Sequence, residues 1–425
     1  MLVQGDQTLP LLASRQVFTA RIFPVNDSDN RLRILHLVSA TAQTQQSLMA
    51  QLTPVVTRCN KHFLQMDVVY FEPGLPQATA LRQMGVPVHE IEWSRKRFSL
   101  GALPALLKII REFEPDVIHA WGHSAQVAVH LLKRFIRSMP PVIWTMPNAL
   151  PITPQSRFLD RKKLDLVKKA LAMNPHIVYP TTAIAAQYRR LGFSDKNFST
   201  IAVGVDVERY KPDEKSRQKL RNELKLDSKA FLIGMHAAFL PENDHNSFIK
   251  ATAELIKYNP NVYVIIAGRG VQRGNSGLMG MLGGGTLATR TALLGEWSDL
   301  GTFYNACDVA CSSALHDGNA MQMAVAMLCG VPCVGTVKGA QGEELGVHGI
   351  AAEPGSPNGL IRGVTRVMEM PADRREFVTK NARQHALANY SVQGTVEKYM
   401  SLYMAMTQAY EASVAKQANA IRKTA

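Results

Sequence analysis

Short apolar runs alternate with stretches of helical spacing along most of the chain. From residue 31, apolar runs lie at 31–38, 63–71, 86–91, 115–119, 141–145 and 176–179, and helical spacing lies at 43–58, 76–84, 100–113, 124–136, 157–173 and 182–191. Apolar runs of this length are typical of strands buried on both faces, as in a parallel sheet covered by helices. The pattern therefore predicts an irregular arm at 1–30 and a Rossmann-like α/β domain at 31–202.

The same alternation begins again near residue 203. Strands are predicted at 231–236, 262–267, 291–294, 309–311 and 333–335, and helices at 244–258, 300–307, 319–329, 357–370, 372–387 and 392–410. We expect a second doubly wound domain at 203–390, a helix at 391–412 that crosses back to the first domain, and a frayed basic tail at 413–425. Ligands of such sheets bind at the carboxyl ends of the strands.

Residues 313–332 form the most informative stretch, read as strand, loop, helix and strand. A tight spot at Gly318 opens the helix, and Gly330 and Pro332 end it. The first backbone N–H groups of a helix are free, so a ligand at this point is expected to be an anion.

This stretch resembles the signature of family-4 glycosyltransferases of bacterial surface-polysaccharide synthesis. The matching positions are Gly318, Ala326, Met327, Gly330 and Pro332. Weaker matches lie earlier in the chain, in the order of the family, at 203–206, 267–270 and 294–295. The resemblance covers most of 31–410. It implies the GT-B fold, in which two Rossmann-like domains face each other across a cleft. The first domain would hold the acceptor and the second the nucleotide sugar.

The charged donor contacts that the resemblance implies are mostly replaced. Ala238 and Asn243 stand where the family has Arg and Lys, and Val325 stands where it has a ribose-binding Glu. Fixed cations at such positions stabilise the pyrophosphate that leaves during transfer. Asp317 keeps the charge of another family Glu, and residues 39–43 replace a Gly-Gly turn with side chains. The sequence thus keeps the glycines and other motif positions of the site but replaces most of its charged residues.

Other residues could supply the missing contacts. The candidates for catalysis are His119, His123 and Asp317, and the candidates for donor binding are Gly268, Arg269, Gly270, Gly318, Asn319, Lys338 and Glu343. Arg269 follows a strand between two glycines and could reach a phosphate, or it could be an ordinary surface arginine. The two histidines could touch the donor sugar, as the resemblance implies, or could belong to the core or to the lining of the cleft.

The composition bears on the number of domains, the cellular location and the cofactors. The 425 residues are 46% hydrophobic and 19% charged, which suits a globular protein of two domains. No apolar run reaches the roughly 18–20 residues that span a bilayer, and no signal peptide is evident, so a cytoplasmic location is expected. The five cysteines have no accompanying His or Asp cluster. We therefore expect neither a metal nor another cofactor.

Positive charge is concentrated in the first half of the chain. Of a net charge of +14, residues 1–200 contribute 24 Lys and Arg against 13 Asp and Glu. These basic residues could form a surface that is simply solvated. Alternatively, they could bind the anionic inner surface of the membrane or an anionic substrate. No nucleic-acid-binding motif is present, so nucleic acid is not an expected partner.

Two functions remain open from the sequence. One is a retaining glycosyltransferase that moves a hexose from a nucleotide sugar to a glycan or lipid-linked acceptor. The other is a pseudoenzyme that keeps the fold, has lost the donor site, and binds a protein partner in a polysaccharide-assembly complex.

Overall fold

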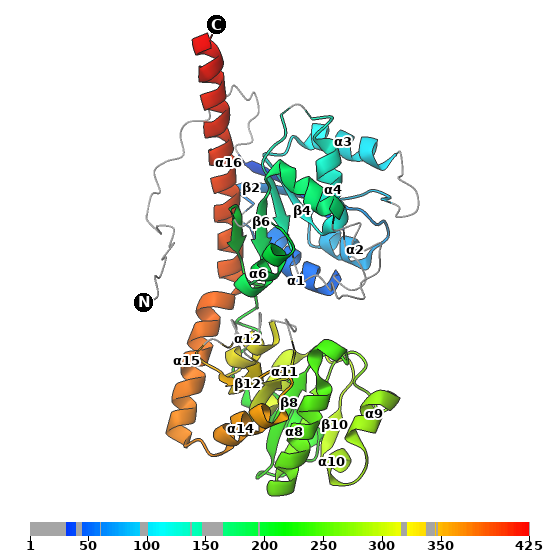
Figure 1. The fold of residues 1–425 in the computed structure, drawn as a ribbon, viewed down its shortest axis with the longest axis vertical. Helices are drawn as coiled ribbons and strands as arrows, with labels where there is room; N and C mark the ends of the chain where they lie inside the picture. Colours follow the sequence, from blue (N-terminus) through cyan, green and yellow to red (C-terminus); the bar gives the residue numbers. More distant parts are fainter. Residues whose placement is uncertain are drawn as a thin grey trace.

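The computed structural model contains two α/β domains, one above the other in Figure 1. It describes residues 31–39, 45–59, 61–93, 101–136, 138–146, 165–193, 196–315, 321–336, 345 and 347–424, the side chains of 45–47 and 417–424 excepted. All strand pairs within the two sheets are parallel. The predicted fold class, two doubly wound parallel-sheet domains, is confirmed.

The first domain has a seven-stranded sheet in the order β3-β2-β1-β4-β5-β6-β7. The strands are β1 (Leu32–Val38), β2 (Leu64–Tyr70), β3 (Val88–Glu90), β4 (Val117–Trp121), β5 (Val142–Thr145), β6 (His176–Tyr179) and β7 (Phe198–Thr200). The helices are α1 (Gln45–Arg58), α2 (Pro76–Gln83), α3 (Ala102–Phe113), α4 (His123–Leu132) and α6 (Thr182–Arg190), with further helical residues at 165–170 and a 3-10 turn at Leu171–Met173. One face of the sheet packs against α3, α4 and α6, and the other against α1 and α2.

The second domain has a six-stranded sheet in the order β10-β9-β8-β11-β12-β13. The strands are β8 (Phe231–His236), β9 (Val262–Ala267), β10 (Thr291–Leu293), β11 (Val309–Ser312), β12 (Cys333–Thr336) and β13 (Ile350–Ala352). The helices are α7 (Glu214–Glu223), α8 (His245–Tyr258), α9 (Ser276–Leu282), α10 (Thr286–Thr289), α11 (Leu300–Ala306), α12 (Met321–Leu328), α14 (Pro357–Met368) and α15 (Ala372–Tyr390), with a 3-10 turn at Pro241–Asn243. One core cluster joins α7, α11, α12 and α15 to the sheet, and another joins α8, α9 and α14.

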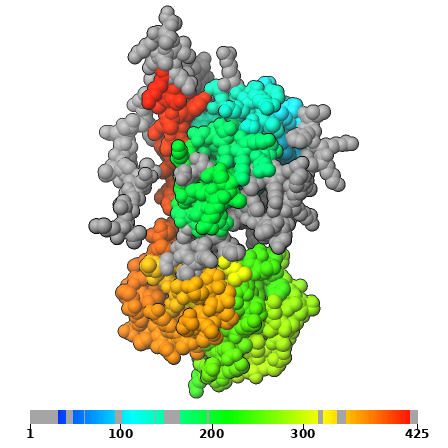
Figure 2. Space-filling view, in the orientation of Figure 1, coloured from blue at the N-terminus to red at the C-terminus, as the bar shows by residue number. Residues whose placement is uncertain are grey.

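The last helix, α16 (Val392–Thr424), belongs to the core of the first domain. Its residues Val392, Val396, Tyr399 and Tyr403 are buried in the cluster that covers β1 and β4. Figures 1 and 2 show this red helix against the side of the first domain, while α15 lies on the second. The chain therefore passes between the domains twice, once after β7 and once between α15 and α16.

The two passages lie side by side. The N–H of Val205 donates to the Tyr390 carbonyl (2.7 Å), and the N–H of Val392 donates to the Val205 carbonyl (3.0 Å). A side chain at Gly204 would collide with the backbone of Val392, so only glycine permits this approach. Near this point the guanidinium of Arg58, in the first domain, lies 2.8 Å from the carboxylate of Asp206.

Several elements differ from the prediction at their ends. The strand predicted at 115–119 begins at Val117, since Pro115 has no N–H to donate and Asp116 is used to hold the N–H of Arg33 (2.8 Å). The frayed tail predicted at 413–425 is instead a continuation of α16 through Thr424. Helices α7 and α9 were not predicted, because charged residues dominate the first and glycines the second.

Candidate active site

The loop after β8 occupies the carboxyl edge of the second sheet and contains Ala238 and Asn243. Asn243 is only 8% exposed, and its side-chain amide donates a hydrogen bond to the Ala238 carbonyl (2.8 Å). The hydroxyl of Ser313, after β11, donates to the Asn243 carbonyl (2.8 Å). The loop is therefore closed on itself and fixed to the next strand, and the Asn243 amide is used inside the protein.

The loops after β9 and β10 are joined to this loop through the backbone. The N–H of Gly268 donates to the Gly295 carbonyl (2.7 Å), and the N–H of Phe239 donates to the Arg269 carbonyl (2.8 Å). Gly268 has a φ of 142°, and a Cβ there would collide with the Ala237 carbonyl, so this position requires glycine. Three loops thus form one rigid edge.

Arg269 and Gly270 lie on this edge. Gly270 has a φ of 80°, which suits glycine, and faces the Phe239 side chain. The Arg269 side chain is exposed. An exposed guanidinium beside strand ends can receive a phosphate, so the structure leaves Arg269 available for the predicted role.

Val325 lies in the middle of α12 with none of its side chain exposed. It belongs to the same apolar cluster as Phe303 and Tyr304 of α11. The position at which the resemblance implies a ribose-binding Glu therefore lies on a helix face that packs into the apolar core.

His119 is fully buried in β4 and has partners at both ring nitrogens. Nδ1 lies 2.9 Å from the Tyr403 hydroxyl of α16, and Nε2 lies 2.8 Å from the Thr145 hydroxyl of β5. Burial lowers the pKa of His119 well below 6.5, and the nearby His36 and His176 lower it further. A neutral imidazole enclosed in this way holds α16 to the sheet, and its placement gives no support to the predicted catalytic role.

His36 is a second buried histidine that the sequence analysis did not single out. It pairs in register with His119 on the neighbouring strand, and its Nδ1 accepts a hydrogen bond from the Trp121 indole N–H (3.0 Å). Burial lowers the pKa of His36 to about 3. The available signal was a pair of histidines, each in the middle of an apolar run, and such residues usually belong to the core. The Nε2 of His36 is buried and has no hydrogen-bond partner within the described residues.

His123 has a different position from His119. It is the first residue of α4, directly after the carboxyl end of β4, and it is half-buried. The preceding Gly122 lies against Ser39, which follows β1. Of the two predicted histidines, His123 is the one at the edge where ligands of such sheets bind.

The remaining predicted site residues lie outside the described part of the chain. These are Asp317, Gly318, Asn319, Lys338 and Glu343. Within the described residues, no group of three or more His, Cys, Asp or Glu side chains could hold a metal ion. The helices described here include none with the length and apolar character that crossing a membrane requires.

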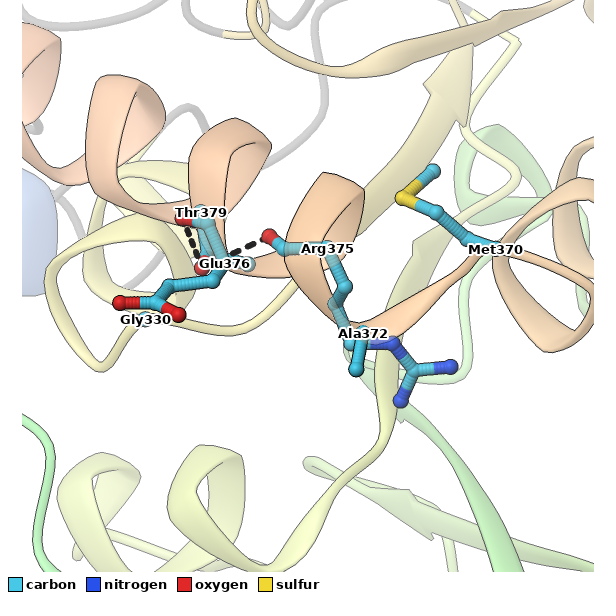
Figure 3. Close-up of a pocket in the computed structure, with 6 residues that line it drawn as sticks. All are labelled: Gly330, Met370, Ala372, Arg375, Glu376 and Thr379. Carbon is cyan, nitrogen blue, oxygen red and sulfur yellow. Dashed lines mark hydrogen bonds between the residues drawn. The ribbon is translucent and has the colours of Figure 1, made fainter.

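A shallow depression of about 500 Å³ lies elsewhere on the second domain, beside the start of α15 (Figure 3). Its lining residues are Gly330, Met370, Ala372, Arg375, Glu376 and Thr379. The Arg375 guanidinium donates to the Val367 carbonyl (2.8 Å), and the Thr379 hydroxyl donates to the Arg375 carbonyl (3.0 Å). None of the predicted site residues lines it, so we do not assign it to the active site.

Each domain matches a known family. Residues 216–385 match the family described as "Glycosyl transferases group 1", and residues 55–209 match "Glycosyltransferase Family 4". The predicted resemblance to glycosyltransferases is therefore confirmed in both domains, with the family-4 match in the first.

Individual relatives support the same assignment. The chain is 24% identical over 230 residues to the lipopolysaccharide core biosynthesis mannosyltransferase LpsB of Rhizobium meliloti, a match that spans 53% of this chain and 60% of that protein. The Anabaena HepE structure in complex with UDP and glucose has a TM-score of 0.72 at 21% identity, covering 88% of this chain and 100% of its own. A Rickettsia africae glycosyltransferase has a TM-score of 0.77 at 14% identity, covering 89% and 99%. At these identities the solved structures establish the GT-B fold.

Proposed function

We propose that this chain, built from the two domains of a GT-B glycosyltransferase, transfers a hexose from a nucleotide sugar to a glycan or lipid-linked acceptor. The observation that carries the proposal is the rigid edge formed by the loops after β8, β9 and β10, where glycine is required at Gly268. The relatives support the substrate class, since LpsB is named a mannosyltransferase of the lipopolysaccharide core and HepE was solved with UDP and glucose. The acceptor would then be a bacterial surface polysaccharide or its lipid-linked precursor.

In this proposal the donor phosphates lie at the second domain and the acceptor at the first. Arg269 would bind a phosphate of the donor, with Lys338 as a second cation, and the backbone at Gly268, Gly270, Gly318 and Asn319 would approach the nucleotide. Positively charged side chains beside the leaving diphosphate stabilise its negative charge as the glycosidic bond breaks. His123 and Asp317 would touch the donor sugar, and Glu343 would face the nucleotide or the sugar. No metal takes part.

A second candidate function is supported by two observations on the donor side. The Asn243 amide is used within its own loop, and Val325 is part of the core. A protein that has lost donor chemistry but kept a rigid frame could serve as a binding partner in a polysaccharide-assembly complex. The presence of a protein partner distinguishes this candidate from the first.

Calorimetric titration with UDP, GDP and ADP, followed by the matching sugar nucleotides, tests the two candidates. We expect one nucleotide to bind in the micromolar range, about −8 kcal/mol. Arg269→Ala should weaken this binding roughly tenfold, whereas Arg273→Ala, which removes an exposed guanidinium from the same loop, serves as the matched control. Absence of binding at millimolar nucleotide, together with absence of transfer, would favour the binding partner.

We also propose that the first domain associates with an anionic membrane from the cytoplasmic side. At the end of α4, exposed Lys133 and Arg134 adjoin Phe135, which is 56% exposed. Basic residues near an aromatic side chain favour the surface of anionic lipid. We expect flotation with vesicles that contain phosphatidylglycerol, weakened by salt and by Lys133→Gln/Arg134→Gln. Equal flotation with neutral vesicles would exclude this electrostatic mode.

A further inference from the structure

The turns that follow β1 and β4 are locked together. These strands are parallel neighbours in the register Val38 to Trp121, so Ser39 lies beside the turn at Gly122. The backbone N–H of Ser39 donates to the Trp121 carbonyl (2.9 Å). Gly122 has a φ of 89°, and a Cβ there would collide with the Ser39 carbonyl. Only glycine fits between Trp121 and His123.

The hydroxyl of Ser39 completes the first turn of α4. It donates to the Trp121 carbonyl (3.4 Å) and accepts from the backbone N–H of Ala125 (3.1 Å). The N-cap residue of α4 is Gly122, which has no side chain and makes no side-chain cap. A helix normally receives this bond from its own N-cap residue. Here a residue 86 positions earlier in the sequence supplies it.

We propose that Ser39 is a positioning residue that fixes the first turn of α4, and with it the imidazole of His123, at the carboxyl edge of the first sheet. The inference rests on the proposed function, in which His123 touches the donor sugar. His123 lies between Gly122, whose conformation Ser39 restricts, and Ala125, whose N–H Ser39 binds. Loss of the hydroxyl removes the hydrogen bond from the Ala125 N–H in α4. The hydrogen bond from the Ser39 backbone N–H to the Trp121 carbonyl of β4 remains.

Steady-state transfer kinetics of Ser39→Ala test this role. We expect kcat to fall about tenfold or more while KM for the donor changes less than about threefold, since a reacting group is misplaced rather than a binding group removed. Ser39→Thr keeps the hydroxyl and should restore most of the rate. The matched control is Ser138→Ala, which removes an exposed hydroxyl of the same domain that lies 2.6 Å from the Tyr410 hydroxyl.

A double variant separates positioning from general destabilisation. If Ser39 acts through His123, Ser39→Ala/His123→Ala should be no slower than His123→Ala alone. Multiplied losses in the double variant would overturn the inference. So would a Ser39→Ala enzyme with unchanged kcat, or a Ser39→Thr enzyme as slow as Ser39→Ala.

A second measurement decides the matter even if the wild-type protein transfers no sugar and the proposed function fails. In nitrogen-15-labelled histidine spectra, the His123 signal is identified by its loss in His123→Ala. Its ring-nitrogen chemical shifts should change in Ser39→Ala and stay unchanged in Ser138→Ala. His123 chemical shifts that are the same in the wild-type protein and in both variants overturn the positioning role irrespective of activity.

Discussion

The two domains use polar residues in opposite ways. In the first domain, His36 and His119 lie in the middle of the sheet. Partners on neighbouring elements bind both ring nitrogens of His119 and Nδ1 of His36, while the buried Nε2 of His36 has no hydrogen-bond partner within the described residues. In the second domain, Ala238, Asn243 and Val325 stand at positions where the resemblance leads us to expect charged residues. A buried histidine in the middle of the first sheet therefore marks an internal contact, while the exposed edge of the second domain relies on its backbone. Exposure, rather than residue type, distinguishes a site from a core.

Val325→Glu should have the largest effect. It introduces the carboxylate that the resemblance implies for ribose binding in the second domain. A carboxylate at this fully buried position has no water and should lower the free energy of unfolding by roughly 4 kcal/mol or more. Urea unfolding measures the change. Val325→Ile, which keeps the apolar character and adds one methylene, should cost only about 1–3 kcal/mol. A stable Val325→Glu protein with improved nucleotide binding would show that this helix face still opens to the donor.

His119→Ala should have the next largest effect, now in the first domain. The substitution leaves a cavity and removes the partner of the Tyr403 and Thr145 hydroxyls, so we expect a loss of roughly 3 kcal/mol in unfolding free energy. His123→Ala is the comparison and should cost less than about 1 kcal/mol while reducing transfer. The distinction between the two histidines fails if His119→Ala abolishes transfer in a protein of unchanged stability.

Acid should weaken the fold through the buried histidines. In the native state the pKa of His36 is about 3, whereas in the unfolded chain it is near 6.5. Below pH 6.5 the unfolded chain therefore binds more protons, and stability falls by about 1.4 kcal/mol per pH unit for such a histidine until pH approaches 3. Urea unfolding at pH 7, 6 and 5 measures the slope. His36→Gln, which can still accept from Trp121, should flatten it, and an unchanged slope would remove His36 from the explanation.

Arg58→Ala, which removes a contact between the domains, should have the smallest effect. The Arg58 and Asp206 side chains are 51% and 36% exposed, so water and salt screen their attraction, and we expect a loss of about 0.5 kcal/mol. The Arg58 hydrogen bond also lowers the pKa of Asp206. A double-mutant cycle with Asp206→Asn, at low and high salt, measures the coupling. A coupling of several kcal/mol would mean that this pair, rather than the backbone at Val205, joins the domains.

The sheets were predictable because strands buried on both faces are continuous apolar runs, as at Val262–Ala267. Helix α7 was not, because its stabilising contacts come from elsewhere: Arg217 and Arg221 bind Asp308 before β11. The motif correctly located Ala238 and Asn243 at the carboxyl edge, but no motif reports that the Asn243 amide turns inward. For His119, both faces of β4 are covered, so alternation could not reveal that its face lies under α16.

The packing of α16 under the first sheet has a consequence for how the chain is made on the ribosome. Residues 31–202 emerge first, yet the face of their sheet around β1 and β4 is covered by Val392, Val396, Tyr399 and Tyr403. Domains usually fold in order of synthesis. Here the hydrophobic core of the first domain closes only after residues 392–403 have been synthesised. Nascent chains that stop before α16 would expose that apolar face and depend on chaperones to stay unaggregated.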